Sequence, residues 1–175
     1  MIGTAMAIPY LNKPIDISVI VNMDSLQATP TWRLQEENFS LMLRLREVTK
    51  ETLYIQTRSK DESLIELAKH ANIEQFYNEE LELRKAFNYP PFTTFIHLTW
   101  QGTKDIVESI EKLIQTTFVE YGVSVYTAPN PPKDSAIEYA LMRMPAKNWP
   151  DKKLSTLLRT LPPSIRIVIN PDRII

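Results

Sequence analysis

Cysteine and histidine, two residue types that often mark metal sites and catalytic centres, are absent or rare in this 175-residue chain. Cysteine is absent, which excludes disulfides, thiolate metal sites and cysteine nucleophiles. The two histidines, His70 and His97, are far apart in the sequence and have no ligand pattern around them. We therefore predict no catalytic residue, no metal site and no cofactor, and we interpret both histidines as surface or strand residues.

The glycine content excludes a glycine-rich phosphate-binding loop. The chain has three glycines, Gly3, Gly102 and Gly122, and none of them belongs to a G-x-G-x-x-G or G-K-[S/T] motif. The 13 prolines instead indicate turns whose φ angle is fixed by the proline ring.

Any contact with nucleic acid would depend on a local cluster of cations. The 20 Lys and Arg residues are balanced by 21 Asp and Glu, so no overall positive field is expected. The candidate DNA-binding residues are Lys133, Arg143, Lys147, Lys152, Lys153 and Arg159, with Arg166 and Arg173 as candidates for the same face. Acidic residues at 134, 138 and 151 interrupt this set, and a solvated surface of mixed charge is the alternative.

Aromatic residues offer a second route to nucleic acid. Phe92, Phe95 and Trp100 lie in a segment, residues 92–100, that alternates as a half-exposed strand does, and they could stack on single-stranded DNA. The alternative, which we favour, is that they pack against the amphipathic helix expected at 105–121.

The first third of the chain predicts a βαβ unit. Residues 15–21 are mostly apolar and β-branched, which indicates a strand buried on both faces. Pro30 begins a helix over 31–46, and a second strand is expected at 52–57. Strand, helix and strand in this order are typical of a parallel sheet.

Two further helices are expected before the pair of prolines at 90 and 91. The first covers 63–69, and the second is capped by Asn72, with Gln75 three residues later, and continues to Phe87. The second helix is strongly charged, so most of it is expected to face solvent.

The remaining elements follow a different order. Strands are expected at 92–100, 123–127, 135–144 and 165–169, and helices at 105–121 and 151–161. The order β-α-β-β-α-β predicts a split βαβ, ferredoxin-like unit.

One stretch carries a specific family resemblance. Residues 79–92 read EELELRKAFNYPPF, which resembles the E-E-L-x-x-R-[R/K] and P-P-[F/W] segment of the primosomal protein N′ (PriA) family of replication-restart helicases. Residues 30–41, PTWRLQEENFSL, resemble a helix of the second helicase lobe in that family.

Shorter matches to the same family run in order from residue 3 to residue 171. They are GTAM at 3–6, Asp24-Ser25, YIQT at 54–57, Ala128-Pro129 and the segment 169–171. The residues to which the resemblance gives a structural role in the family motifs are Gly3, Thr4, Arg33, Glu36, Glu80, Arg84, Pro90, Pro91 and Phe92. Trp32 replaces a phenylalanine of the family helix, which favours packing.

The resemblance implies the fold and the partners. Residues 1–60 would be a remnant of the second, RecA-like helicase lobe, 61–91 a helical connector, and 92–175 an α+β C-terminal domain similar to a ribosomal protein. It also implies binding to forked or single-stranded DNA, to single-stranded DNA-binding protein or to other primosome proteins. A homo-oligomer or the missing helicase lobe would be a natural cover for an unpaired sheet edge.

The departures from the family predict that this chain is not an enzyme on its own. Residues 7–13 replace a glycine-containing loop, and residues 44–50 are shorter than the arginine motif that stabilises charge during phosphoryl transfer. Arg44 or Arg46 could be a remnant of that motif, but solvated helix-end cations are the favoured interpretation.

Two alternatives remain open at this stage. The chain could be a piece of an active ATP-dependent 3′-to-5′ helicase, and the position of Met1 in the family pattern favours a truncated chain or a shifted start. It could also be a protein-interaction module that has lost DNA binding. No signal peptide or membrane span is predicted, so we expect a cytoplasmic protein.

Overall fold

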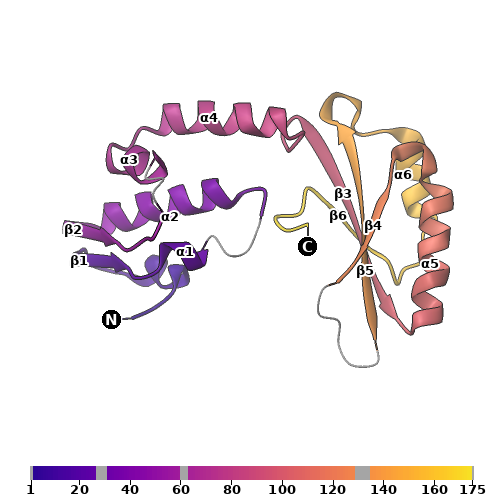
Figure 1. Cartoon of the computed structure of the whole chain (residues 1–175), viewed down its shortest axis with the longest axis horizontal. Coiled ribbons are helices and arrows are strands. Elements are labelled where there is room, and N and C mark those ends of the chain that lie inside the picture. Colours follow the sequence, from indigo (N-terminus) through magenta and orange to yellow (C-terminus); the bar gives the residue numbers. More distant parts are fainter. Residues whose placement is uncertain (1, 27–30, 60–62, 129–134, 175) are drawn as a thin grey trace. The chain divides into compact units, whose positions relative to one another are not determined.

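The computed structural model describes residues 2–26, 31–59, 63–128 and 135–174. The chain is mixed α/β and divides into two compact units, Met1–Leu83 and Arg84–Ile175, called unit 1 and unit 2 below (Figure 1). Pro30, Lys133 and most of the loop that follows Ala128 lie outside the described residues.

Unit 1 contains a two-stranded parallel sheet, which confirms the predicted βαβ unit. Val19 of β1 lies opposite Tyr54 of β2, and helix α2 connects the two strands. The elements are η1 (Ala5–Tyr10), β1 (Ile15–Ile20), α1 (Met23–Leu26), α2 (Leu34–Val48), β2 (Thr49–Ile55), α3 (Ser63–Lys69) and α4 (Ile73–Ala86), of which α4 ends in unit 2. Strand β2 begins three residues earlier than the predicted 52–57.

The core of unit 1 lies between one face of this sheet and the helices. Phe39 of α2 stacks on Phe76 of α4 with ring centroids 4.0 Å apart. Ile20 from β1 and Met42 from α2 are buried in the same cluster. Aromatic pairs of this kind add stabilisation beyond the apolar area that they bury.

The prediction that residues 15–21 are buried on both faces is wrong. Ser18 and Ile20 are buried, but the alternate residues Ile17 and Val19 are 54% and 55% exposed. A strand is buried on both faces only where helices cover both sides of its sheet. Among the described residues, the core of unit 1 forms on one side.

Helix α4 begins at the predicted capping box. The Asn72 Oδ1 atom accepts a hydrogen bond from the Gln75 backbone N–H at 3.2 Å, and its amide donates to Gln75 Oε1 at 2.8 Å. The helix is largely exposed as expected, except that Glu80 is buried along with Phe76.

Unit 2 has the predicted order of elements, β-α-β-β-α-β. It consists of β3 (Thr93–Gly102), α5 (Lys104–Thr117), β4 (Ser124–Thr127), β5 (Ala136–Pro145), α6 (Lys152–Arg159) and β6 (Arg166–Ile169), with short 3-10 turns η2 (Val119–Tyr121) and η3 (Ala146–Asn148). The strands form one antiparallel sheet in the order β4-β5-β3-β6. Strands β5 and β6, which are connected through α6, therefore lie on either side of β3.

Both helices of unit 2 cover the same face of this sheet (Figure 1). Val107 of α5 and Leu154 of α6 share one core with Ile96, Leu98 and other even-numbered positions of β3. Trp100 is 1% exposed, and its indole N–H donates to the Val107 backbone carbonyl at 3.3 Å.

The prediction that the strand at 92–100 is half-exposed is wrong. β3 is the second strand from one edge of the sheet, and its residues from Thr93 to Leu98 are buried on both faces. Trp100 packs on α5 as expected. Phe95, however, points to the opposite face, where the ring of Tyr89 lies 5.8 Å away and the guanidinium of Arg143 5.5 Å away. Side chains of neighbouring segments therefore bury the face that the pattern left to solvent.

Candidate nucleic-acid interface

Helix α6 exposes three of the candidate DNA-binding cations. Leu154 and Leu158 are buried in the core of unit 2, so the helix turns its other faces to solvent. The exposed cations are Lys152, Lys153 and Arg159. The N-cap is Asp151, whose Oδ1 atom accepts a hydrogen bond from the Leu154 backbone N–H at 2.6 Å. This cap supplies a negative charge close to Lys152 and Lys153.

An acidic neighbour offsets one of these cations. The ammonium group of Lys153 donates a hydrogen bond to the Glu120 carboxylate, and this hydrogen bond and charge raise the pKa of Lys153. Lys152 and Arg159 have no ion-pair partner within the described part of the chain. They are the α6 cations that remain available to an external anion.

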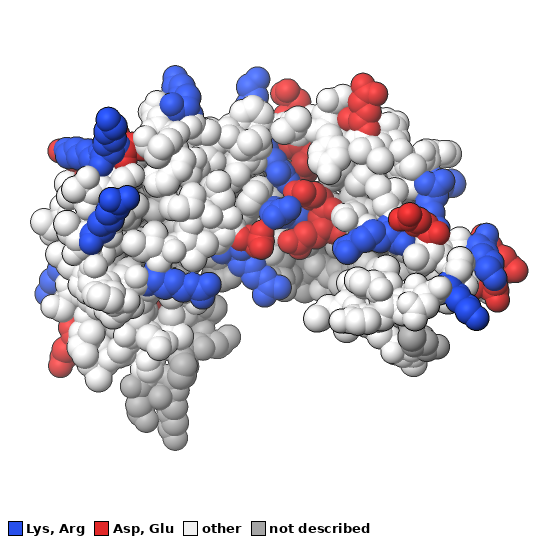
Figure 2. All heavy atoms as spheres, turned by 180° about the vertical axis from the view of Figure 1, so that it is seen from behind, with Lys and Arg blue, Asp and Glu red and all other residues white. Residues whose placement is uncertain are grey.

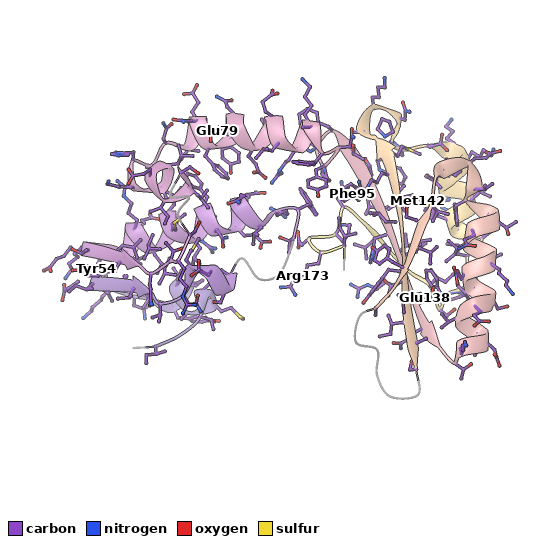
Figure 3. The ribbon with its side chains drawn as sticks, viewed as in Figure 1. Tyr54, Glu79, Phe95, Glu138, Met142 and Arg173 are labelled. Atoms are coloured by element: carbon purple, nitrogen blue, oxygen red, sulfur yellow. The ribbon has the colours of Figure 1, made fainter. Side chains whose placement is uncertain are left out.

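Arg143 lies on the other face of the sheet. It is opposite Phe95 in the register of β3 and β5, and consecutive residues of a strand point to opposite faces. Met142 is buried on the helix side, so Arg143 is on the helix-free side (Figure 3). Arg166 of β6 is opposite Thr99 and lies on the same face as Arg143.

The candidate cations therefore do not form one patch. Lys147 lies in η3, and Arg173 follows β6 in a segment on the helix-free side of the sheet (Figures 1 and 3). Figure 2 shows cationic side chains spread singly over the face it draws, with neutral surface and acidic side chains between them. The structure brings Arg143 and Arg166 to one face and the α6 cations to the other.

An aromatic cluster on the helix-free face was not predicted from the sequence. The rings of His97 and Tyr139 stack with centroids 5.4 Å apart, and Tyr126 lies 5.5 Å from Tyr139 and 6.4 Å from His97. These residues come from β3, β5 and β4, which are adjacent in the sheet. The signal that could have predicted this cluster is that each of the three residues occupies the side of an alternating strand that faces away from the helices.

The segment after β6 borders this aromatic cluster. Asn170, at a φ of 48°, exchanges hydrogen bonds with the backbone of Phe95, one from its own N–H at 2.8 Å and one to its Oδ1 atom at 2.7 Å. The Tyr126 hydroxyl donates to the Ile174 carbonyl. Burial raises the pKa of Tyr126 to about 12, so the hydroxyl keeps the proton that it donates.

The surroundings of His97 in this cluster shift its pKa downward. Burial and the positive charge of Arg166 lower the pKa of His97, against a backbone hydrogen bond with Ile174 that raises it. Its Nε2 atom is buried and has no hydrogen-bond partner among the described residues. His70, in contrast, is exposed beside Glu66 in unit 1.

The family-motif residues of unit 1 make local contacts in the structure. Arg33 forms an ion pair with Glu36 at 3.2 Å, and its guanidinium lies 5.6 Å from the ring of Trp32. Gly3 and Thr4 precede η1, and the Thr4 carbonyl accepts a hydrogen bond from the Ala7 N–H.

Two motif segments distant in sequence meet at Asp24. Its Oδ1 atom accepts a hydrogen bond from the Thr57 hydroxyl at 2.9 Å, and its Oδ2 atom accepts one from the Arg58 N–H at 3.0 Å. These hydrogen bonds, the one from Arg58 first, lower the pKa of Asp24. The Asp24-Ser25 and YIQT motifs therefore form one structural link.

The motif residues around the unit boundary differ in burial. Glu80 and Pro90 are buried, Arg84 is half-buried, and Pro91 and Phe92 are exposed. The Tyr89 N–H donates to the Arg84 carbonyl at 2.7 Å, which ends α4 just before the two prolines.

The described residues contain no assembled catalytic or metal site. Arg44 and Arg46 lie exposed on α2, and Arg44 donates to the Ser40 carbonyl of its own helix. In this part of the chain, no group of three His, Cys, Asp or Glu residues is placed to hold a metal ion. None of the helices described has the length and apolar character needed to span a bilayer.

Comparison with curated proteins gives six matches, all replication restart proteins PriA. The chain is 31% identical over 108 residues to PriA from Treponema pallidum and 33% identical over 108 residues to PriA from Chlamydia muridarum. This confirms the resemblance to PriA. PriA from Borreliella burgdorferi is 30% identical over 111 residues. These alignments cover 58–60% of the chain.

The similarity concerns a limited part of PriA. The chain matches 16%, 14% and 17% of the length of these three relatives, which is consistent with the C-terminal part of PriA. No family model matches the chain. The structure places the candidate cations other than Lys133, which lies outside the described residues. Their contact with DNA is a prediction.

Proposed function

We propose that this chain is a non-catalytic C-terminal portion of a primosomal replication-restart protein, which binds branched or single-stranded DNA or other replication proteins. The similarity to six proteins named replication restart protein PriA carries the proposal. A cytoplasmic location and the division into a lobe remnant (1–60), a connector (61–91) and a C-terminal domain (92–175) belong to it.

The non-catalytic part of the proposal rests on the motifs. The chain contains no glycine-rich phosphate-binding loop, and the segments 7–13 and 44–50 depart from the helicase motifs that they resemble. Arg44 and Arg46 face solvent on α2 in the structure. Stabilising the charge of a transferred phosphoryl group requires arginine in a fixed position, which these side chains lack.

A second candidate function is a part of an active ATP-dependent 3′-to-5′ helicase. The observation that favours it is that the chain matches only about one sixth of the length of its PriA relatives, as a piece of a larger helicase would. DNA-stimulated ATP hydrolysis by the chain itself would support this function and contradict the first. We expect none.

A third candidate is a protein-interaction module without DNA binding. The net charge of −1 and the separation of the cations onto two faces favour it. Binding to a C-terminal peptide of single-stranded DNA-binding protein, without binding to DNA, would identify this function.

Fluorescence anisotropy distinguishes the first and third candidates. We expect the chain to bind a labelled forked oligonucleotide at low salt, with an affinity that falls steeply as salt rises, because phosphate contacts release counterions. Lys152→Gln with Arg159→Gln tests the α6 cations, and Lys104→Gln on α5 is a control outside the candidate set. Absence of binding to both the fork and the peptide would refute the proposal.

A further inference from the structure

The helix-free face of the unit 2 sheet differs from its other face in charge. Arg143 and Arg166 are both exposed on this face. Glu138 is the one carboxylate within the four strands, and it lies on the helix side of the sheet. Burial is the main cause that raises the pKa of Glu138, and the negative charges of Glu111 and Glu108 on α5 add to it. The strand positions of the helix-free face therefore carry cations and no anion, which suits a polyanionic partner.

The same face holds the aromatic cluster of His97, Tyr126 and Tyr139. The two tyrosines are half-buried, so part of each ring contacts solvent, whereas His97 is 7% exposed beneath them. The three rings lie on three neighbouring strands, with centroids 5.4–6.4 Å apart. The rings of Tyr126 and Tyr139 therefore lie side by side at the surface of the sheet, with the ring of His97 beneath them.

The segment from Asn170 to Ile174 holds one of these rings in place. Asn170 is fixed to β3 by its two hydrogen bonds with Phe95, and the Ile174 carbonyl accepts the hydrogen bond from Tyr126. Asp172 in this segment is exposed and is the acidic group nearest in sequence to these contacts. A ring that is held before binding loses little entropy when a ligand stacks on it.

These features together suit the recognition of unpaired bases. Some single-strand-binding domains use a four-stranded sheet whose aromatic side chains stack on two or three bases, and positively charged side chains in single-strand binders follow the phosphate backbone. The cations at both sides of the cluster, without a strand carboxylate, favour this occupant over a neutral protein surface. We infer that the helix-free face of unit 2 binds single-stranded nucleic acid, with bases on Tyr126 and Tyr139 and phosphates on Arg143 and Arg166. The inference rests on the proposed function, since it locates the DNA contact.

The test uses the full chain and a labelled oligothymidylate of about 12 nucleotides, within the site sizes of known single-strand binders. Tyr139→Ala is expected to weaken binding by roughly tenfold, the loss typical of one stacked base. Tyr139→Phe keeps the ring and should recover most of the affinity. Tyr77→Ala, an exposed tyrosine of α4, is the matched control and should bind as the unchanged chain does.

Two further measurements distinguish stacking from a structural role. In Tyr139→Trp, a stacked base should quench the added tryptophan fluorescence when the oligonucleotide binds. Arg166→Gln removes an exposed side chain and should lower the salt dependence by about one phosphate contact without changing the melting temperature.

The outcomes separate this inference from the proposed function. If the unchanged chain binds the oligonucleotide, and Tyr139→Ala and Arg166→Gln bind it equally well, then the inference is wrong. Loss of binding in Lys152→Gln with Arg159→Gln would then place the contact on α6 and leave the proposed function intact. If the unchanged chain binds neither the fork nor the oligonucleotide, DNA binding itself fails.

Discussion

The sheets of the two units are covered to different extents. In unit 2, the residues of β3 from Thr93 to Leu98 are buried on both faces. In unit 1, β2 is the one strand that pairs with β1 among the residues that the structure describes, and Ile17, Val19 and Tyr54 are each more than half exposed. Unit 2 closes its own core around a four-stranded sheet, whereas unit 1 leaves an apolar sheet face in solvent.

The difference shows where each unit obtains its stability. A two-stranded sheet is marginal by itself, and the core of unit 1 depends on Phe39, Phe76 and their neighbours in the helices. An exposed apolar face is typical of a surface that contacts further protein. The sequence predicted a partner for the unpaired edges of the sheet in residues 1–60, and the exposed apolar face is a second surface that such a partner could cover.

The largest expected effect is on the core of unit 2. Trp100→Ala should destabilise this unit by about 3–5 kcal/mol, because it removes a fully buried ring together with the hydrogen bond from its indole N–H to the Val107 carbonyl. Hydrogen exchange measured by mass spectrometry should show loss of protection in β3 and β5. Equal loss of protection in α2 would contradict the separate stability of the two units, because they would then unfold together.

A smaller effect is expected at the start of α6. Asp151→Ala removes the side-chain acceptor of the Leu154 N–H and should cost about 1 kcal/mol of unfolding free energy. Chemical denaturation measures this loss. Asp151→Ser keeps a capping oxygen and should restore most of it, and a loss as large as that of alanine would exclude capping as the cause.

The stability of unit 2 should depend on pH through Glu138. Burial, and then the charge of Glu111, raise the pKa of Glu138 above its ordinary value of 4.5. The folded state therefore binds the proton more tightly than the unfolded state, and the contribution of Glu138 to stability falls as pH rises above that value. Glu138→Gln should raise the melting temperature near pH 7, and the gain should disappear below the ordinary pKa. A gain that does not change with pH would contradict this account.

The smallest effect on stability is expected at the open face of unit 1. Val19→Lys places a charge at a position that is 55% exposed, so the free energy of unfolding should change by no more than about 0.5 kcal/mol. Analytical ultracentrifugation should show less self-association if this face joins copies of the chain. Gln115→Lys on α5 adds the same charge to unit 2 and serves as the control.

Local signals predicted the helices well. The bounds of α3 at 63–69 agree with the structure, and α4 begins at the capping box that Asn72 and Gln75 form. The order of the unit 2 elements also followed from the sequence, because each strand and helix has its own hydrophobic period. These features depend on residues within a few positions of one another.

Burial was harder to predict than secondary structure. The mostly apolar, β-branched segment 15–21 was predicted to be a fully buried strand, yet one of its faces lacks a cover among the described residues. The alternating pattern of β3 indicated a solvated face, yet Arg143, Tyr89 and the segment after β6 bury Phe95 and His97. In both strands, the coverage depends on segments that are remote in the sequence.

The sequence by itself determined which chemistry this chain lacks and which family it resembles. The absence of cysteine, the three glycines and the EELELRKAFNYPPF segment are properties of composition and order, which need no fold to be recognised. Only the tertiary structure decided that Arg143 and Arg166 share a face with Tyr126, Tyr139 and His97, while the α6 cations lie on the other. Strand order and register bring these residues together, and both are set by contacts between segments far apart in the chain.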